Sequence, residues 1–177
     1  MRQNEFRTYY EADMQRVPGM RRWEYSTLLL RHLRHAQKDR NKLSRLFHKA
    51  VFRVLSKTHN LEIPSACKIG KGLYLGHIYN ITFNPKVVIG DNCNIHKGVT
   101  IGQENRGKRK GTPIIGNKVW IGVNATVVGK ITVGDDVMIA PNAYVNCDVP
   151  SHSIAIGNPC KIISRENATE GYINHMA

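Results

Sequence analysis

A six-residue periodicity runs through the chain between residues 63 and 163. Its clearest stretch has an aliphatic residue at every sixth position: Ile115, Ile121, Val127, Val133, Ile139 and Val145. Small or β-branched residues follow four positions after each of these: Val119, Ala125, Ile131, Val137, Ala143 and Val149. So short a repeat is typical of a parallel β-helix, in which each hexad forms one face and about three hexads form one turn. Stacked turns would bury the aliphatic positions in continuous ladders.

The periodicity changes register beside a histidine. One register holds Ile63, Ile69 and Leu75, and a second register, two residues out of step, holds Phe83, Ile89, Ile95 and Ile101. The shift falls between His77 and Phe83, which predicts a bulge or a corner at this histidine. A longer interruption at residues 103–113 is polar, basic and glycine-bearing, and it predicts a loop between coils. Long loops on rigid scaffolds are frequent sites of function.

The residues before the repeat are expected to be helical. Apolar residues recur at three- and four-residue spacing, namely Leu43, Leu46, Phe47, Ala50, Val51, Val54 and Leu55. This pattern predicts helix over residues 20–58, with a turn near residues 37–41 and a short leading helix before Pro18-Gly19. Such a segment could cap the open end of the solenoid or rest on anionic lipid as a basic amphipathic surface. A cap is favoured, because a solenoid needs covered ends.

The charge of the 177-residue chain is uneven. The formal net charge is +13, and residues 1–60 hold 14 Lys and Arg against 5 Asp and Glu. A basic balance suggests nucleic acid as a partner. No recognition motif or aromatic platform accompanies it, so no nucleic-acid partner is expected. The N-terminus lacks the apolar stretch of a signal peptide, and no segment is apolar enough to span a membrane.

The four cysteines, Cys67, Cys93, Cys147 and Cys160, follow no disulfide or metal spacing. Cys67 and Cys93 take the fifth hexad position, where small core residues occur elsewhere. A cytoplasmic location is therefore expected, with the inner face of the membrane as a further placement if the helices touch lipid. The predicted organisation is a basic helical segment (1–60), a β-helix domain (61–165) and a C-terminal tail (166–177).

Residues 61–163 resemble the catalytic domain of serine O-acetyltransferases, which are hexapeptide-repeat acyltransferases with a left-handed parallel β-helix. The motifs that carry this resemblance are LEIPSACKIGKGLYLGH (61–77), VVIGDN (87–92), GVTIG (98–102), VPSH (149–152) and GNPCKII (157–163). The resemblance implies a mainly β fold with an N-terminal helical segment. It also implies a homotrimer with active sites between subunits, and acetyl-CoA as co-substrate.

The resemblance assigns catalytic roles to His77 and Glu62. The matching histidine is the general base that takes a proton from the acceptor hydroxyl, and the matching carboxylate orients the imidazole. An imidazole suits this role because its pKa lies near working pH. By position, the implied CoA contacts are Gly102, Gly122, Ala140 and Asn142, with Lys161 and Arg165 near the phosphates. Small residues at such points let the backbone approach a ligand, although they equally suit tight corners.

Two positions depart from the family pattern. Gly76 stands where serine acetyltransferases have an Asp that holds the acceptor, and Gly111 and Thr112 replace an Arg-His pair that binds the serine carboxylate. Charge-assisted bonds are worth about 1.5–3 kcal/mol each, so their loss predicts poor use of serine. The glycines suggest a more open pocket, and the basic loop at Arg106 offers cations for an anionic acceptor.

His96 lies one coil beyond His77 and is a candidate acceptor contact. Two histidines on neighbouring coils resemble a zinc site of β-helical carbonic anhydrases. Zinc needs three protein ligands, and the third is missing from the register, so no metal is expected.

These departures favour an acetyl-CoA-dependent O-acetyltransferase acting on a saccharide hydroxyl, similar to enzymes of capsule, exopolysaccharide or lipopolysaccharide synthesis. The alternatives are a serine O-acetyltransferase of cysteine biosynthesis and a non-catalytic β-helix scaffold. The substrate-binding residues expected for a saccharide are Gly76, His96, Thr112 and Arg106.

Overall fold

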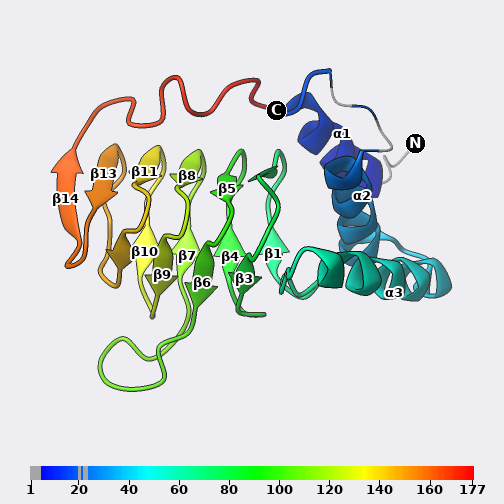
Figure 1. The fold of residues 1–177 in the computed structure, drawn as a ribbon, viewed down its shortest axis with the longest axis horizontal. Coiled ribbons are helices and arrows are strands. Elements are labelled where there is room, and N and C mark those ends of the chain that lie inside the picture. The colour runs from blue at the N-terminus through cyan, green and yellow to red at the C-terminus, as the bar shows by residue number, and fades with distance from the viewer. Residues whose placement is uncertain (1–4, 20, 22–23) are drawn as a thin grey trace.

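The computed structural model describes residues 5–19, 21 and 24–177, which form a parallel β-helix preceded by helices (Figure 1). The predicted mainly β fold with a helical N-terminal segment is confirmed. The helices are α1 (Glu5–Gln15), α2 (Tyr25–Lys38) and α3 (Lys42–Thr58). The helix expected from residue 20 begins at Tyr25, and residues 20, 22 and 23 of that prediction lie outside the described residues.

The strands of the β-helix form three sheets. The first sheet contains β1 (Lys68–Ile69), β4 (Val88–Ile89), β7 (Ile114–Ile115) and β10 (Thr132–Val133). The second contains β2 (Tyr74–Gly76), β5 (Asn94–His96), β8 (Val119–Ile121), β11 (Val137–Ile139), β13 (Ser153–Ile156) and β14 (Lys161–Ser164). The third contains β3 (Thr82–Phe83), β6 (Thr100–Gly102), β9 (Thr126–Val128) and β12 (Tyr144–Val145). The chain turns from the second to the third sheet at what we call the 2–3 corner, and from the third to the first at the 3–1 corner.

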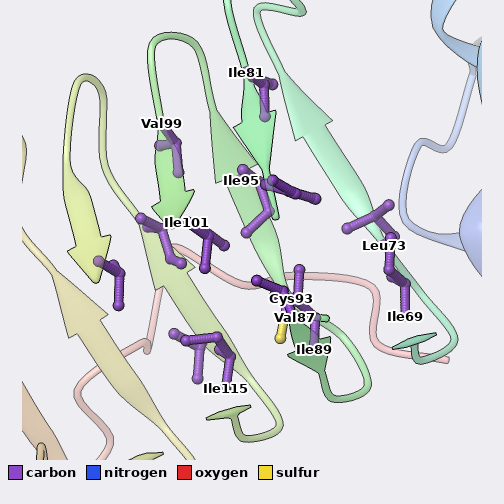
Figure 2. Packing of buried hydrophobic residues seen from close by; sticks show 14 of the residues in the cluster. Ile69, Leu73, Ile81, Val87, Ile89, Cys93, Ile95, Val99, Ile101 and Ile115 are labelled. Atoms are coloured by element: carbon purple, nitrogen blue, oxygen red, sulfur yellow. The ribbon is translucent and has the colours of Figure 1, made fainter. Parts of the chain in front are cut away.

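The hexad positions form the interior of the coils. Ile121 pairs with Ile95 of the preceding coil and with Ile139 of the next, and all three side chains are fully buried. Figure 2 shows such aliphatic side chains from successive strands packed against one another inside the solenoid. Burial of one such side chain contributes about 1.5–3 kcal/mol, and each coil gains it only when neighbouring coils cover the ladder.

The register shift falls at the expected place. Between β2 and β3 the 2–3 corner contains residues 77–81, whereas between β5 and β6 it contains only residues 97–99. The two additional residues make the first 2–3 corner longer than the next. His77 is its first residue, so the predicted corner beside this histidine is confirmed.

Helix α2 closes the N-terminal end of the solenoid. Leu29, Leu30 and Leu33 are buried in the same apolar cluster as Leu61 and Ile63 of the first coil. Helix α3 packs on α2, through buried Phe52 among others, and its C-terminal end adjoins the first coil (Figure 1). No described helix has both the length and the apolar content needed to cross a lipid bilayer.

A buried ion pair joins the helices to the first coil. The guanidinium of Arg34 on α2 donates two hydrogen bonds to the carboxylate of Asp13 near the end of α1, at 2.7 and 2.9 Å. Arg34 also donates to the carbonyl oxygens of Ile69 and Gly70, and Asp13 accepts from the backbone N–H of Leu73. Removing one partner of a buried pair costs about 3–5 kcal/mol, so this contact fixes the position of the helical segment.

The C-terminal tail after β14 runs back along the solenoid toward the helices (Figure 1). Its main anchor is Asp136, which accepts hydrogen bonds from the backbone N–H groups of Ala168 and Thr169 and from the Thr169 hydroxyl. Burial alone would raise the pKa of Asp136, but hydrogen bonds from Thr169 and His152 outweigh it and lower that pKa. At its end, Ala177 exchanges two hydrogen bonds with the side chain of Asn92.

Candidate functional site

The candidate base His77 lies exposed at the start of the long 2–3 corner, directly after β2. Its backbone has a φ of +51°. Asn124 and Asn142 adopt φ values of +58° and +60° at the same corner in later coils. The residue of the first 2–3 corner that matches them is Asn80, with a φ of +54°, because each of these residues donates its N–H to the corner of the preceding coil. The left-handed conformation of His77 is therefore an additional feature of the longer corner, where its side chain is exposed.

Glu62, the predicted orienting carboxylate, begins the third sheet in the first coil. It forms a parallel bridge with Thr82, and its N–H donates to the carbonyl oxygen of Ile81 at 2.8 Å. Because Ile81 ends the corner that His77 begins, the two residues border one corner of the same coil. Both side chains are exposed, and within the described part of the chain no hydrogen bond or ion pair joins them.

The structure gathers several predicted residues in one ladder at the edge of the second sheet. Gly76 pairs with His96, and Gly122 and Ala140 directly follow the paired residues Ile121 and Ile139. Lys161 extends this edge, because it pairs with Ile156 in the antiparallel β13–β14 hairpin. The corner residues His77 and Asn142 follow Gly76 and Ala140 closely in the chain. Predicted base, acceptor contacts and CoA contacts therefore line the 2–3 corner over successive coils.

Gly76 and His96 are tightly packed against each other. A Cβ atom at position 76 would lie 2.5 Å from Nδ1 of His96, which is closer than any real contact. The His96 ring also packs on Trp120, with the ring centroids 4.8 Å apart. Its Nε2 atom is buried and has no hydrogen-bond partner among the described residues. Burial, and then the nearby His77, lower the pKa of His96, so this ring is neutral at neutral pH.

The remaining predicted residues lie at other corners. Gly102 ends β6 at the 3–1 corner and pairs with Val128. Residues 103–113 follow it and fold back as a hairpin closed by two backbone hydrogen bonds between Glu104 and Gly111. Thr112 contacts the carbonyl oxygen of Lys86 at 3.5 Å. Within one chain, these residues do not meet His77.

The 3–1 corner contains a basic surface pocket of about 350 Å³. Its lining residues are Glu104, Arg106, Lys108, Arg109, Val128 and Asn146. The backbone carbonyl of Arg109 accepts a hydrogen bond from the N–H of Lys130, which holds the hairpin on the next coil. The pocket therefore presents cations on a fixed loop. The predicted phosphate contact Arg165 lies elsewhere, after β14, where its N–H donates to the carbonyl oxygen of His152.

The described residues contain no group of three or more His, Cys, Asp or Glu side chains arranged to hold a metal ion. The buried thiols of Cys67 and Cys93 belong to the core, and burial raises their pKa values to about 11 and about 12.

Aromatic residues around His96 were not predicted from the sequence. Tyr74, Trp120 and the tail residue Tyr172 surround this region, and the Trp120 and Tyr172 centroids are 5.1 Å apart. Tyr74 and Trp120 share one outward hexad position, which Asn94, Met138 and Ile154 hold in the other coils, so the six-residue period could have placed these two rings in one ladder. Tyr172 had no such signal, since the tail lacks the six-residue periodicity.

Comparisons with known proteins agree on one group of relatives. Residues 112–147 match the bacterial transferase hexapeptide family (six repeats). The chain is 41% identical over 106 residues to a serine acetyltransferase of Helicobacter pylori. The aligned residues make up 60% of this chain and 62% of that protein. The chain thus spans less than two thirds of the length of this relative.

Solved structures give the same result. Soybean serine acetyltransferase superposes with a TM-score of 0.75 at 26% identity, over 91% of this chain and 70% of that one. The Brucella abortus serine acetyltransferase in complex with coenzyme A superposes with a TM-score of 0.74 at 26% identity, over 92% of this chain and 67% of that one. The chain is therefore a hexapeptide-repeat protein similar to serine acetyltransferases.

These findings contradict the predicted saccharide acceptor and the predicted closer likeness to polysaccharide O-acetyltransferases. That interpretation depended on an open pocket at two glycines. In the structure, His96 fills the space beside Gly76, and a Cβ at Gly111 would lie 3.0 Å from Cβ of Lys130. Gly111 also has a φ of +141°, which favours glycine for backbone reasons alone. The two glycines do not mark room for a sugar.

Proposed function

We propose that this chain is an acetyl-CoA-dependent O-acetyltransferase whose acceptor is L-serine. The observation that carries this proposal is the exposed His77 at the 2–3 corner, at the end of the ladder that holds Gly122 and Ala140, in a chain similar to serine acetyltransferases over most of its length. The relative in complex with coenzyme A supports the co-substrate.

In this reaction His77 acts as the general base. Its imidazole takes the proton of the serine hydroxyl as the oxygen attacks the thioester carbonyl of acetyl-CoA. The tetrahedral intermediate then collapses, the carbon–sulfur bond breaks, and the imidazolium returns the proton to the CoA thiolate. The products are O-acetylserine and CoA. Glu62, which borders the same corner, is the candidate carboxylate that orients His77 and stabilises the imidazolium once substrates are bound.

Recognition of serine must differ from that in the family pattern. His96 is the candidate contact beside His77, because its unpartnered Nε2 can exchange a hydrogen bond with a polar group after a small ring movement. Arg106 in the 3–1 corner pocket is the candidate for the serine carboxylate, since guanidinium groups bind carboxylates strongly.

These two corners come together only between chains. A three-fold trimer would place the 3–1 corner of one chain against the 2–3 corner of its neighbour, so that each site takes His77 from one subunit and Arg106 from the next. Cyclic symmetry makes such heterologous contacts close into a ring. The same arrangement would form a CoA groove between subunits, along Gly122 and Ala140.

The direct test is an acceptor assay with the full chain. The loss of acetyl-CoA thioester is followed with L-serine, with D-serine and without acceptor, and the product is identified by mass spectrometry. We expect saturable turnover with L-serine, formation of O-acetylserine and little turnover without it. Acetyl-CoA binding without any L-serine-dependent turnover would refute the proposed acceptor.

A further inference from the structure

Helix α3 presents an apolar stripe to solvent. Leu43, Leu46, Phe47 and Val54 have exposed fractions of 79%, 66%, 61% and 66%, and Ala50 between them is also exposed. Their spacing places them on one side of the helix, opposite the buried residues Phe52 and Ser56 that face α2. Contiguous exposed apolar surface of this kind marks an interaction site.

This stripe does not serve the solenoid. The end of the β-helix is covered by α2, whose Leu29, Leu30 and Leu33 pack into the core cluster. Helix α3 contributes to that cluster through Phe52 and Leu55 on its inner side. The outward stripe therefore has no packing role in the described chain, and Figure 1 shows α3 at the outer end of the molecule.

The charges of α3 are of a single sign. The helix carries five exposed cations and no carboxylate, and these cations are Lys42, Arg45, Lys49, Arg53 and Lys57. In the described part of the chain, none of them takes part in an ion pair. Four of the five lie along one edge of the apolar stripe by helical spacing. The start of the helix is also preorganised, because Oδ1 of Asn41 accepts hydrogen bonds from the N–H groups of Leu43 and Ser44.

We propose that α3 docks the protein on an anionic lipid bilayer, with the stripe inserted at the headgroup level and the flanking cations on the lipid phosphates. An amphipathic helix that combines an apolar face with a purely basic edge fits this surface in both chemistry and shape. A second copy fits poorly, because pairing two stripes would bring cations together with no carboxylate on either helix to compensate. This proposal is independent of the acceptor of the proposed reaction.

Vesicle sedimentation of the full chain tests this docking. Vesicles of phosphatidylcholine alone are compared with vesicles that also contain phosphatidylglycerol. We expect binding to the anionic vesicles only, weakened by added salt because the attraction is screened. The double variant Lys49→Glu/Arg53→Glu should lower the partition coefficient more than about twentyfold, since each lost cation is worth roughly fivefold.

Variants of the stripe separate insertion from simple charge attraction. Leu46→Ser/Phe47→Ser changes exposed side chains, so the variant should keep its circular dichroism and thermal transition while losing at least about tenfold in binding. Ile163→Ser, at a residue that is 52% exposed on β14, is the matched control and should bind as the wild type does.

Three results would each overturn the proposal. The first is no binding to anionic vesicles at low ionic strength. The second is unchanged binding of the folded stripe variant, which would reduce the effect to net charge. The third is a smaller oligomer for the stripe variant in light scattering, which would show that a second copy covers α3.

Discussion

At position 76 the absence of a side chain is tied to a histidine in the next coil. The His96 ring occupies the space that any Cβ at this position would need. The sequence suggested an empty pocket there, because it shows the missing Asp and not the ring that replaces it. The register count already placed His96 one coil beyond His77, but it did not show that the His96 ring fills the space beside Gly76.

Packing at this contact gives a stability prediction. Gly76→Ala should lower the free energy of unfolding by about 1–3 kcal/mol, because the added methyl overpacks against His96. Combining it with His96→Ala should recover part of that loss, with a coupling energy of about 0.5–3 kcal/mol in a double-mutant cycle. Gly102→Ala is the control, since the nearest atoms to its Cβ would be side-chain methyl groups, Cγ1 of Val128 at 3.2 Å and Cγ2 of Thr100 at 3.7 Å. If urea unfolding shows that Gly76→Ala and His96→Ala change the free energy of unfolding additively, the proposed contact between the two positions is contradicted.

At the scale of elements, periodicity decided what could be predicted. The hexads allowed the coils and the ladders to be predicted, because both consist of repeated apolar contacts. They also allowed the long corner at His77 to be predicted, because it interrupts the repeat. The C-terminal tail was predicted as a segment, but its contacts with the solenoid were not, since single polar contacts such as those of Asp136 leave no period in the sequence. The Arg34–Asp13 pair was missed for the same reason. The candidate site was predicted residue by residue, but its division between two corners required the strand register.

The α2–α3 interface contains a stack of histidines. His48 on α3 stacks on His35 with the centroids 3.9 Å apart, and its Nδ1 lies 2.8 Å from Nδ1 of His32. Burial, then His35 and His32, and last Arg31 lower the pKa of His48 to about 4, and Asp39 opposes this shift. Burial lowers the pKa values of His32 and His35 as well.

This stack predicts acid sensitivity with a defined sign. The unfolded chain binds protons at its histidines below about pH 6.5, whereas folded His48 does so only near its lowered pKa. Stability is therefore complete above about pH 6.5 and is lost as the pH falls toward 4. His48→Gln should lose less stability than the wild type between about pH 7 and pH 5 in urea unfolding. His175→Gln, in the exposed tail, is the control and should lose as much stability as the wild type over this pH range. If the free energy of unfolding of His48→Gln falls with pH as steeply as that of the wild type, the role of the stack is contradicted.

For the whole molecule, the two corners predict a shared site. His77→Ala and Arg106→Glu should each inactivate their own trimers, because each removes one half of every site. Every mixed trimer would contain one site with both residues intact. Random one-to-one mixing should then restore about a quarter of wild-type activity. If mass spectrometry verifies that mixed trimers have formed and no activity is recovered, the two residues do not form a site across two chains. Either both residues then belong to a site within one chain, or Arg106 lies outside the site.

The most direct measurement is the turnover number of His77→Ala with acetyl-CoA and L-serine, beside that of Glu62→Gln and of the control His175→Ala. The proposed mechanism predicts a fall of roughly 10²–10⁴-fold for His77→Ala, with CoA affinity by calorimetry and oligomer mass unchanged. Glu62→Gln should lose less, because the base remains, and His175→Ala should match the wild type. A turnover number for folded His77→Ala within a few-fold of the wild type would contradict the assignment of this histidine as the base.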